Sequence, residues 1–363
     1  MKILLIGEYS NLHNTLAKGL RELGHKVTVA SDGDDWKNYP RDIDLKREPG
    51  HRMQYLWKLI KALPRMRGYD VVQIINPMFL ELKAERILPI YKYLRRHNRK
   101  VVMGAFGMDH YWVTVNTLNR PLRYSDFNIG DHIRTDEQAN LYRDEWILTA
   151  KNDLSTYIAE DCDGIPACLY EYWATYNAVS ELRNKMRFIP LPIVMPEIYR
   201  TTYFGGPLKL FVGISKGRSA YKGTDIMLQA AQALKEKYPE QLDLSIAEGV
   251  PFDEYQRMMD GSDAILDQLY SYTPSMNSLL AMSKGIIVIG GGEPENYEIL
   301  GETELRPIIN VQPNYQSVYD ELEQLILHPE RISDLKQQSV EYVLRHHDYL
   351  KVAEQYIKFY QEL

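Results

Sequence analysis

The sequence of 363 residues has few of the features that mark secreted or membrane-spanning proteins. It contains two cysteines, Cys162 and Cys168, and no uninterrupted apolar run of 18 or more residues. Two cysteines cannot build a disulfide framework, and a transmembrane helix needs about 20 consecutive apolar residues. The apolar run within residues 1–16 is too short for a secretory signal and is typical of a first buried strand. We therefore expect a cytoplasmic protein.

Patterns that indicate a metal enzyme or a P-loop nucleotidase are also missing. No two histidines have the spacing His-x-x-x-His, the two cysteines have no paired partners, and there is no Walker loop. We predict that the protein needs no metal and no other cofactor.

One basic segment stands out in a chain whose net charge is −6. Residues 1–190 contain 28 Lys/Arg and 24 Asp/Glu (+4), residues 191–363 contain 15 and 25 (−10), and residues 51–100 alone contain 12 and 3 (+9). This segment is either a solvated helix face packed on a sheet, or a contact with an anionic membrane surface or a lipid diphosphate acceptor. No nucleic-acid motif accompanies the charge, so no nucleic-acid partner is predicted.

Short apolar strands alternate with helical patterns along the whole chain. The strands predicted in this way cover residues 2–6, 26–30, 71–75, 101–105, 164–168, 208–213, 242–247, 263–267 and 286–289. Such alternation indicates parallel sheets with crossover helices. We therefore predict an α/β protein with two doubly wound, Rossmann-like domains that face a cleft.

A segment rich in proline and glycine, residues 188–207, separates the two alternating runs. We predict a first domain of residues 1–190, a second domain of residues 191–345 and a final helical segment of residues 346–363. Within the first domain, residues 106–150 have weak periodicity, so we expect an irregular, exposed insertion, with a helix over 139–160.

A loop with three cations follows the predicted strand at 208–213. It contains Gly213, then Lys216, Arg218 and Lys222 within seven positions, and a helix comes next. Departure of a nucleoside diphosphate leaves negative charge on a phosphate, and fixed cations stabilise that charge. The loop therefore predicts a diphosphate site, although cations in strand–helix loops are often only solvated.

Residues 267–298 predict the other half of this site. A strand ends at Asp267, a loop with Pro274 follows, and a helix begins near Ser275. The first backbone amides of a helix point at a bound anion, which suits a diphosphate. The predicted donor-binding residues of this stretch are Gln268, Thr273, Ser275, Met276 and Asn277.

Together these motifs resemble the retaining glycosyltransferases of family four, which have the GT-B fold. The resemblance rests on the order Gly-His…Val-Thr-Val after the first helix, the Lys222-Gly223 pair, and the runs SDAILDQ, LLAMSKG and GGGEPE. It implies transfer of a sugar, with retention, from a nucleoside-diphosphate donor to a glycan or lipid-linked acceptor in cell-envelope polysaccharide biosynthesis. It also implies that the helix in 346–363 crosses back to the first domain. Lys222 would bind the donor diphosphate, with either Lys216 or Arg218 as its partner; spacing does not decide between them, and Arg218 is preferred for its bidentate guanidinium.

Two positions of the second domain depart from the family pattern. The family has two glutamates eight positions apart, and Tyr272 and Leu280 stand in their places. Neither offers a carboxylate to the donor ribose. Glu293 and Glu295, which follow the three glycines at 290–292, are the candidate replacements, unless they only keep the edge of the sheet soluble.

The first domain supplies the candidate acceptor side. The family motif His-Gly-x-Asp appears as residues 106–109 with Phe in the first place, followed by His110. Asp109 is a candidate catalytic residue beside Arg218 and Lys222 of the second domain, with ordinary helix capping as the alternative. The predicted acceptor-side residues are Gly7, Glu8, Tyr9 and His110.

Two other functions stay open. Tyr272 and Leu280 in place of acids are compatible with a non-catalytic, glycosyltransferase-like binding subunit. A nucleotide-sugar epimerase on the same fold is the other alternative.

Overall fold

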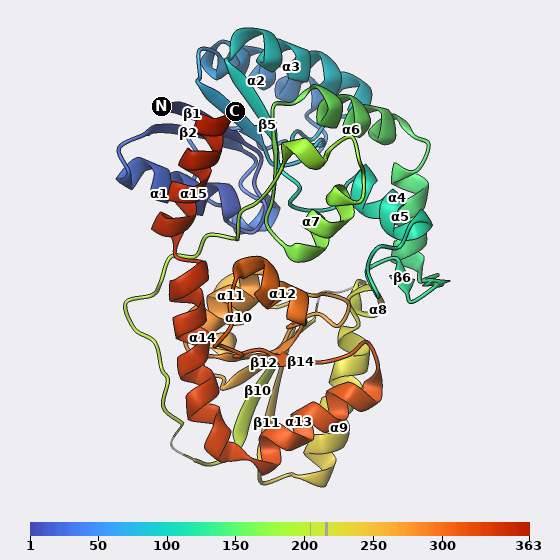
Figure 1. The fold of residues 1–363 in the computed structure, drawn as a ribbon, viewed down its shortest axis with the longest axis vertical. Helices are drawn as coiled ribbons and strands as arrows, with labels where there is room; N and C mark the ends of the chain where they lie inside the picture. Colours follow the sequence, from blue (N-terminus) through green and yellow to red (C-terminus); the bar gives the residue numbers. More distant parts are fainter. Residues whose placement is uncertain (204, 215–216) are drawn as a thin grey trace. The chain divides into compact units, whose positions relative to one another are not determined.

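The computed structural model describes residues 1–203, 205–214 and 217–363, without the side chains of Trp36 and Phe252. The chain forms two units (Figure 1). The first unit contains residues 1–121, 142–192 and 349–363, and the second contains residues 122–141 and 193–348. Each unit therefore includes a segment from the other half of the sequence.

The first unit is built on a parallel sheet with the order β3-β2-β1-β4-β5. All residues of the central strand β1 but the first are buried, as expected for a strand that is covered on both faces. A short parallel pair, β8 and β9, extends the sheet through bridges beside β5. The strands are β1 (Lys2–Ile6), β2 (Lys26–Ser31), β3 (Ile43–Asp44), β4 (Val71–Ile74), β5 (Lys100–Met103), β8 (Ile165–Ala167) and β9 (Met186–Phe188).

Helices connect these strands, and the last helix of the chain packs beside the first one (Figure 1). Gly19 makes this approach possible, because a Cβ atom there would lie 2.6 Å from the carbonyl oxygen of Tyr349. The α-helices are α1 (Leu12–Glu22), α2 (Arg52–Ala62), α3 (Ala84–His97), α4 (His110–Leu118), α6 (Ala150–Asp161), α7 (Tyr170–Asn177) and α15 (Tyr349–Glu362). Short 3₁₀ turns are η1 (Asp35–Lys37), η2 (Leu63–Met66) and η3 (Arg183–Lys185).

The second unit has its own parallel sheet, with the order β11-β10-β12-β13-β14. Its core joins apolar residues of these strands to the inner faces of α9 and α13. The strands are β10 (Leu208–Ile214), β11 (Leu242–Glu248), β12 (Ala264–Leu266), β13 (Ile287–Gly290) and β14 (Ile309–Asn310). The helices are α8 (Ser219–Lys222), α9 (Thr224–Lys237), α10 (Phe252–Asp260), α11 (Met276–Ser283), α12 (Pro294–Leu300), α13 (Tyr315–Leu327), η4 (Pro329–Arg331) and α14 (Ile332–His346).

The segment 106–150 differs from the exposed, irregular insertion that the sequence predicted. Residues 110–118 form α4, in which Trp112 and Asn116 are buried. Residues 122–141 belong to the second unit and include a small hairpin of β6 (Asn128–Ile129) and β7 (His132–Ile133). The helix predicted at 139–160 is broken into α5 (Glu137–Trp146) and α6. The prediction of an irregular, exposed insertion was wrong because its burial depends on partners distant in sequence.

The predicted α/β class with two doubly wound parallel sheets is confirmed. In the first unit the strand order reverses beside β1, and in the second it reverses beside β10. Ligands of such sheets bind outside the carboxyl ends of the strands at this switch point. The main junction lies after residue 192, where the sequence predicted it after residue 190, and residues 349–363 belong to the first unit. The largest difference from the predicted ranges is that residues 122–141 belong to the second unit.

Candidate active site

The loops after β10, β12 and β13 meet at the carboxyl edge of the second sheet. Glycines allow this close approach: a Cβ atom on Gly213 would lie 2.6 Å from the hydroxyl of Tyr255, and one on Gly291 would lie 2.1 Å from the carbonyl oxygen of Ser271. A Cβ atom on Gly290 would lie 3.3 Å from the carbonyl oxygen of Gln268, which is half-buried. Gly213, the glycine predicted to bind the donor, therefore lies on β10 at the switch point of the sheet.

The helix α11 begins at this edge, as predicted, with Ser275 as its N-cap residue. The side chain of Asp267 accepts a hydrogen bond from the Ser275 hydroxyl at 3.2 Å, which ties the helix start to the end of β12. Asn277 donates to the Tyr255 hydroxyl at 3.0 Å. Met276 is half-buried, while Thr273 is buried in the preceding loop. The amides of residues 275–277 thus lie at a helix N-terminus, and phosphate binding by them stays a prediction.

The cationic loop leads into the four-residue helix α8. Arg218 is the N-cap of this helix and Lys222 is its last residue. The Arg218 guanidinium lies 5.3 Å from the ring centre of Tyr221, and its Nε atom has no hydrogen-bond partner among the described residues. The carbonyl of Lys222 accepts a 3.0 Å hydrogen bond from the amide of Leu269, which links this loop to the one after β12. Lys216 lies outside the described residues.

Glu293 is buried and its carboxylate is surrounded by donors. Its Oε1 atom accepts from the hydroxyl of Tyr124 at 2.6 Å and from the amides of Gln312 at 2.7 Å and Asn310 at 3.1 Å. Its Oε2 atom accepts from the guanidinium of Arg123 at 2.7 Å. To bind a donor ribose, as the sequence predicts, Glu293 would have to exchange one of these donors for a sugar hydroxyl.

The Arg123 guanidinium also pairs with Glu295, and this hydrogen bond lowers the pKa of the Glu295 carboxyl. Tyr272, in the place of the family's first glutamate, accepts a 2.7 Å hydrogen bond from the amide of Arg123. Its ring packs on Tyr124 with 4.8 Å between ring centres. Tyr272 thus contacts both Arg123 and Tyr124. Leu280, in the place of the second glutamate, is half-buried on α11.

The same segment makes a second contact beside α8. Arg134 is buried and lies 3.6 Å above the ring centre of Tyr270. Its guanidinium donates to the carbonyls of Ala220 at 2.9 Å and Tyr221 at 3.0 Å. Residues 122–141 therefore join the loop after β12, helix α8 and the Glu293 cluster. Arg123, Tyr124 and Arg134 were not predicted from the sequence, because they lie in a stretch without periodicity.

In the first unit, the predicted acceptor-side residues 7–9 lie at the end of β1. Gly7 has a φ of +86°, and a Cβ atom there would lie 2.3 Å from the side chain of Ile75, so only glycine fits. Burial raises the pKa of Glu8 to about 8, although the amides of His13 and Asn14 donate to its carboxylate at 3.0 and 2.8 Å. Tyr9 lines a cavity with Glu8, described below.

Asp109 is fully buried and caps α4. Its carboxylate accepts from the amide of Trp112 at 2.8 Å and from the hydroxyl of Tyr176 at 2.5 Å. Burial raises the pKa of Asp109 to about 6. Capping therefore accounts for one carboxylate oxygen and the Tyr176 hydroxyl for the other, and a catalytic role of Asp109 stays a prediction. His110 is half-buried with its Nδ1 atom 3.1 Å from the Thr114 hydroxyl, and burial lowers its pKa.

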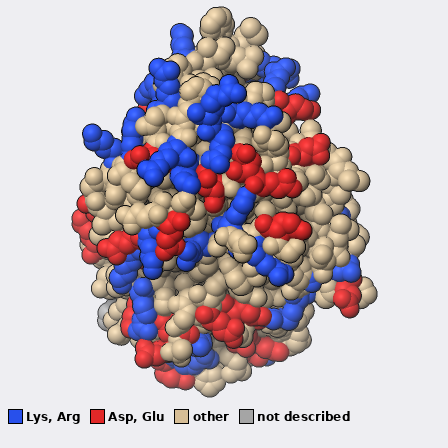
Figure 2. All heavy atoms as spheres, turned by 45° about the horizontal axis from the view of Figure 1, so that its top comes forward, with Lys and Arg blue, Asp and Glu red and all other residues tan. Residues whose placement is uncertain are grey.

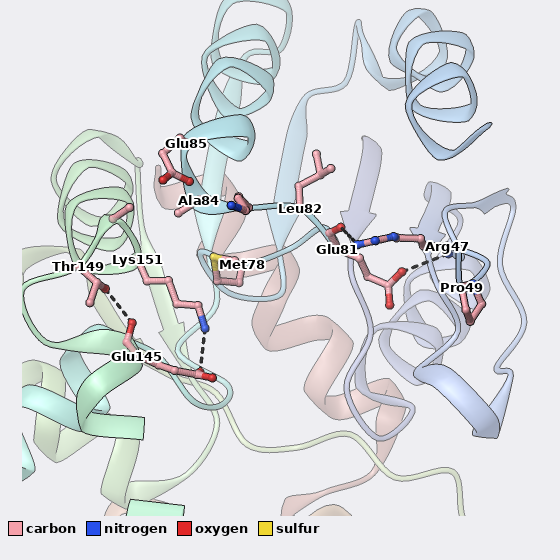
Figure 3. Close-up of a pocket in the computed structure, with 12 residues that line it drawn as sticks. Arg47, Pro49, Met78, Glu81, Leu82, Ala84, Glu85, Glu145, Thr149 and Lys151 are labelled. Atoms are coloured by element: carbon pink, nitrogen blue, oxygen red, sulfur yellow. Dashed lines mark hydrogen bonds and ion pairs between the residues drawn. The ribbon is translucent and has the colours of Figure 1, made fainter. Parts of the chain in front are cut away.

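The described residues of the first unit line cavities. One of about 650 Å³ has the Lys151–Glu145 ion pair on one side and Arg47 with Glu81 on the other, with Met78 between them (Figure 3). A second cavity of about 260 Å³ lies at the switch point of the first sheet and shares Met78 and Glu81 with the larger one. The described residues contain no group of three or more His, Cys, Asp or Glu that could hold a metal ion.

Two parallel doubly wound units define the GT-B class of fold, and solved structures agree. The chain is similar to sucrose-phosphate synthase from Thermosynechococcus elongatus, with a TM-score of 0.61, 13% identity and coverage of 100% of this chain and 99% of that one. It is also similar to Anabaena HepE in complex with UDP and glucose, with a TM-score of 0.59, 13% identity and full coverage of both chains. It is similar as well to UDP-GlcNAc 2-epimerase from Neisseria meningitidis, with a TM-score of 0.55, 14% identity and full coverage of both chains.

No family model matches the sequence, and no curated protein matches it by sequence. The similarity to solved structures therefore establishes the GT-B fold. Among the described residues, no helix is both long and apolar enough to cross a bilayer.

Proposed function

We propose that the protein is a glycosyltransferase that moves a sugar from a nucleoside-diphosphate donor to a glycan or lipid-linked acceptor. The proposal rests on one observation: Arg218 and Lys222 follow β10 at the switch point of the second sheet, where α11 also begins. Anabaena HepE, which shares the fold, was solved with UDP and glucose. The proposed donor is therefore a nucleotide sugar, with its diphosphate between these cations and the amides of residues 275–277.

The proposed chemistry depends on stabilising the leaving group. As the bond between the sugar and the diphosphate breaks, negative charge grows on the phosphate oxygens, and cations held in place lower the energy of that transition state. Because Arg218 and Lys222 would supply this charge, we propose that no metal ion is needed and that activity persists in EDTA. Retention of configuration, a hexose as the sugar and a role in cell-envelope polysaccharide synthesis complete the proposal.

Calorimetric titration with UDP, GDP and ADP tests the donor site. Hydrogen bonds to charged groups contribute about 1.5–3 kcal/mol each, so the double variant R218A/K222A should bind the preferred nucleotide at least about 100-fold more weakly. The matched control is K209A/R331A, which removes two exposed cations elsewhere on the second unit. If both double variants bind as tightly as the natural protein, the site is assigned wrongly.

Two alternatives stay open. The hydrogen bonds that occupy Glu293 and Tyr272 favour a non-catalytic subunit, since neither residue is free to bind a ribose without rearrangement. A nucleotide-sugar epimerase is the other alternative, since the Neisseria meningitidis epimerase shares the fold. Absence of binding to all three nucleotides would support the first, and conversion of a nucleotide sugar without an acceptor would support the second.

We also propose that the first unit contacts an anionic membrane through α2. Met53, Trp57 and Ile60 are spaced four and three residues apart, so they share one helix face, and they are 68%, 59% and 56% exposed. Residues 51–68 around them contain five Lys/Arg and no Asp/Glu. Figure 2, in which the top of Figure 1 comes forward, shows Lys and Arg gathered in this region. An apolar helix face with flanking cations is typical of interfacial membrane binding.

Co-sedimentation with vesicles tests this contact. We expect binding to vesicles with 30% phosphatidylglycerol, weaker binding in high salt and little binding to pure phosphatidylcholine. The variant M53S/W57S/I60S should bind at least about tenfold more weakly, since it loses most of the apolar area. The control L118S/L148S/I198S changes three other exposed apolar residues. Equal binding of the natural protein to both kinds of vesicle would contradict the proposal.

A further inference from the structure

The smaller cavity of the first unit has a strongly acidic lining. It lies between the end of β1 and the end of β4, at the position where doubly wound sheets bind their ligands. Carboxylates come from the loop after β1, from the loop after β2 and from the segment after β4, and none of the described lining residues is basic. The five acidic residues of this lining are Glu8, Asp32, Asp34, Asp35 and Glu81.

Neighbouring cations neutralise only part of this charge. Lys37 pairs with Asp34 at 2.6 Å. Asp32 accepts from the amide of Asp34 at 3.1 Å, which is a neutral donor. Glu81 accepts from the amide of Arg47 at 3.1 Å, while the Arg47 guanidinium donates to the Glu81 carbonyl oxygen. Burial and the negative charge of Asp32 both raise the pKa of the Glu81 carboxyl. The cavity therefore favours a ligand with positive charge.

An independent observation comes from Tyr55 on α2. Its side chain lines the same cavity and is 3% exposed, yet its hydroxyl has no hydrogen-bond partner among the described residues. The amide of Glu81 is close enough to affect the Tyr55 pKa, but an amide can only donate, so the phenol hydrogen still has no acceptor. A buried hydroxyl without an acceptor is costly, and a ligand oxygen in the cavity would satisfy it.

Size and surroundings limit the kind of ligand. A volume of about 260 Å³ is below the roughly 300–1,000 Å³ of drug-sized sites and suits one sugar unit. Met78 and Glu81 also line the 650 Å³ cavity, so the remainder of a larger molecule has a place to continue (Figure 3). Among the described residues, no three of the carboxylates converge as metal ligands would. An ammonium group with hydroxyls beside it matches both the acids and Tyr55.

We propose that this cavity binds a sugar unit carrying a free, protonated amine, with Asp32, Asp35 and Glu81 attracting the amine and the Tyr55 hydroxyl donating to a sugar oxygen. The identification of this unit as the acceptor rests on the proposed transferase function. Acetylation of the amine would remove its positive charge, so the acetylated sugar should bind no more tightly than a neutral sugar.

Saturation-transfer NMR and calorimetry with three probes test the proposal: methyl glucosaminide, its N-acetyl derivative and methyl glucoside. Each is measured with and without saturating UDP. We expect the amine to bind at least fivefold more tightly than either neutral probe, the equivalent of about 1 kcal/mol. In D32N/D35N this preference should vanish, while the control D131N/D243N, which changes two exposed carboxylates of the second unit, should keep it.

The variant Y55F separates ligand contact from folding. It removes a hydroxyl without a partner, so the melting temperature should stay the same or rise while binding of the glucosaminide weakens. Equal binding of all three probes, no binding of any probe, or unchanged preference in D32N/D35N would overturn the inference. Binding of UDP in the same titrations reports on the transferase proposal separately, so either idea can fail without the other.

Discussion

At the scale of single residues, Glu293 shows how a buried carboxylate is held in place. A buried charge is costly unless it is hydrogen-bonded, and here Tyr124, Asn310, Gln312 and Arg123 all donate to it. Tyr124 is the one donor among them that is both neutral and contributed by the segment 122–141. Removing the Tyr124 hydroxyl therefore tests how much its hydrogen bond to Glu293 stabilises the second unit.

We predict that Y124F lowers the free energy of unfolding of the second unit by about 2 kcal/mol, because it removes a hydrogen bond to a buried charge. In a unit of this size the melting temperature should fall by about 4–8 °C. Differential scanning calorimetry, which resolves units that unfold separately, is the measurement. Y199F is the control, since that tyrosine is 47% exposed on the same unit. Equal melting temperatures for the two variants would mean that the Glu293 cluster does not depend on Tyr124.

At the scale of helices and strands, elements whose signals lie within their own residues were predicted correctly from the sequence. The strands β1, β4, β10 and β13 were predicted because each is a short run of mostly apolar residues. Helix α11 was placed correctly from Pro274 and Ser275, whose preferences for helix starts are local. Elements of this kind carry their signal within about ten residues, so one sequence is enough.

The same reasoning failed where an element depends on a distant partner. Asp109 looks catalytic in the sequence, and only the fold shows that Tyr176, 67 residues away, donates to its buried carboxylate. Residues 122–141 have no periodicity, since polar contacts such as Arg134 on Tyr270 replace an apolar face. The acidic cavity is lined by residues 8, 32, 34, 35, 55 and 81, among others, and no sequence spacing predicts that they lie together.

At the scale of the whole molecule, the two units exchange segments, and the chain passes from one to the other at four places. The first unit receives α15, on which Val352, Ala353, Tyr356, Phe359 and Tyr360 are buried. Tyr360 also donates a 2.8 Å hydrogen bond to Gln73 on β4, next to the central strand of the first sheet. The second unit receives residues 122–141. Neither half of the sequence therefore contains all of its own core.

We predict that a fragment of residues 1–192 does not fold cooperatively. Without α15 it leaves the apolar face of α1 and Gln73 uncovered, and its residues 122–141 lack Tyr272 and Glu293 as partners. Loss of five buried side chains at up to about 1.5–3 kcal/mol each removes a free energy comparable to the roughly 5–15 kcal/mol by which domains are usually stable. The expected result is low soluble yield and no sharp thermal transition by circular dichroism. As a control, residues 349–363 are joined to residue 192 by a flexible Gly/Ser linker and residues 122–141 are replaced by a short one. This control should regain a cooperative transition, and a sharp transition in the unmodified fragment would show that α15 is not part of the folding unit.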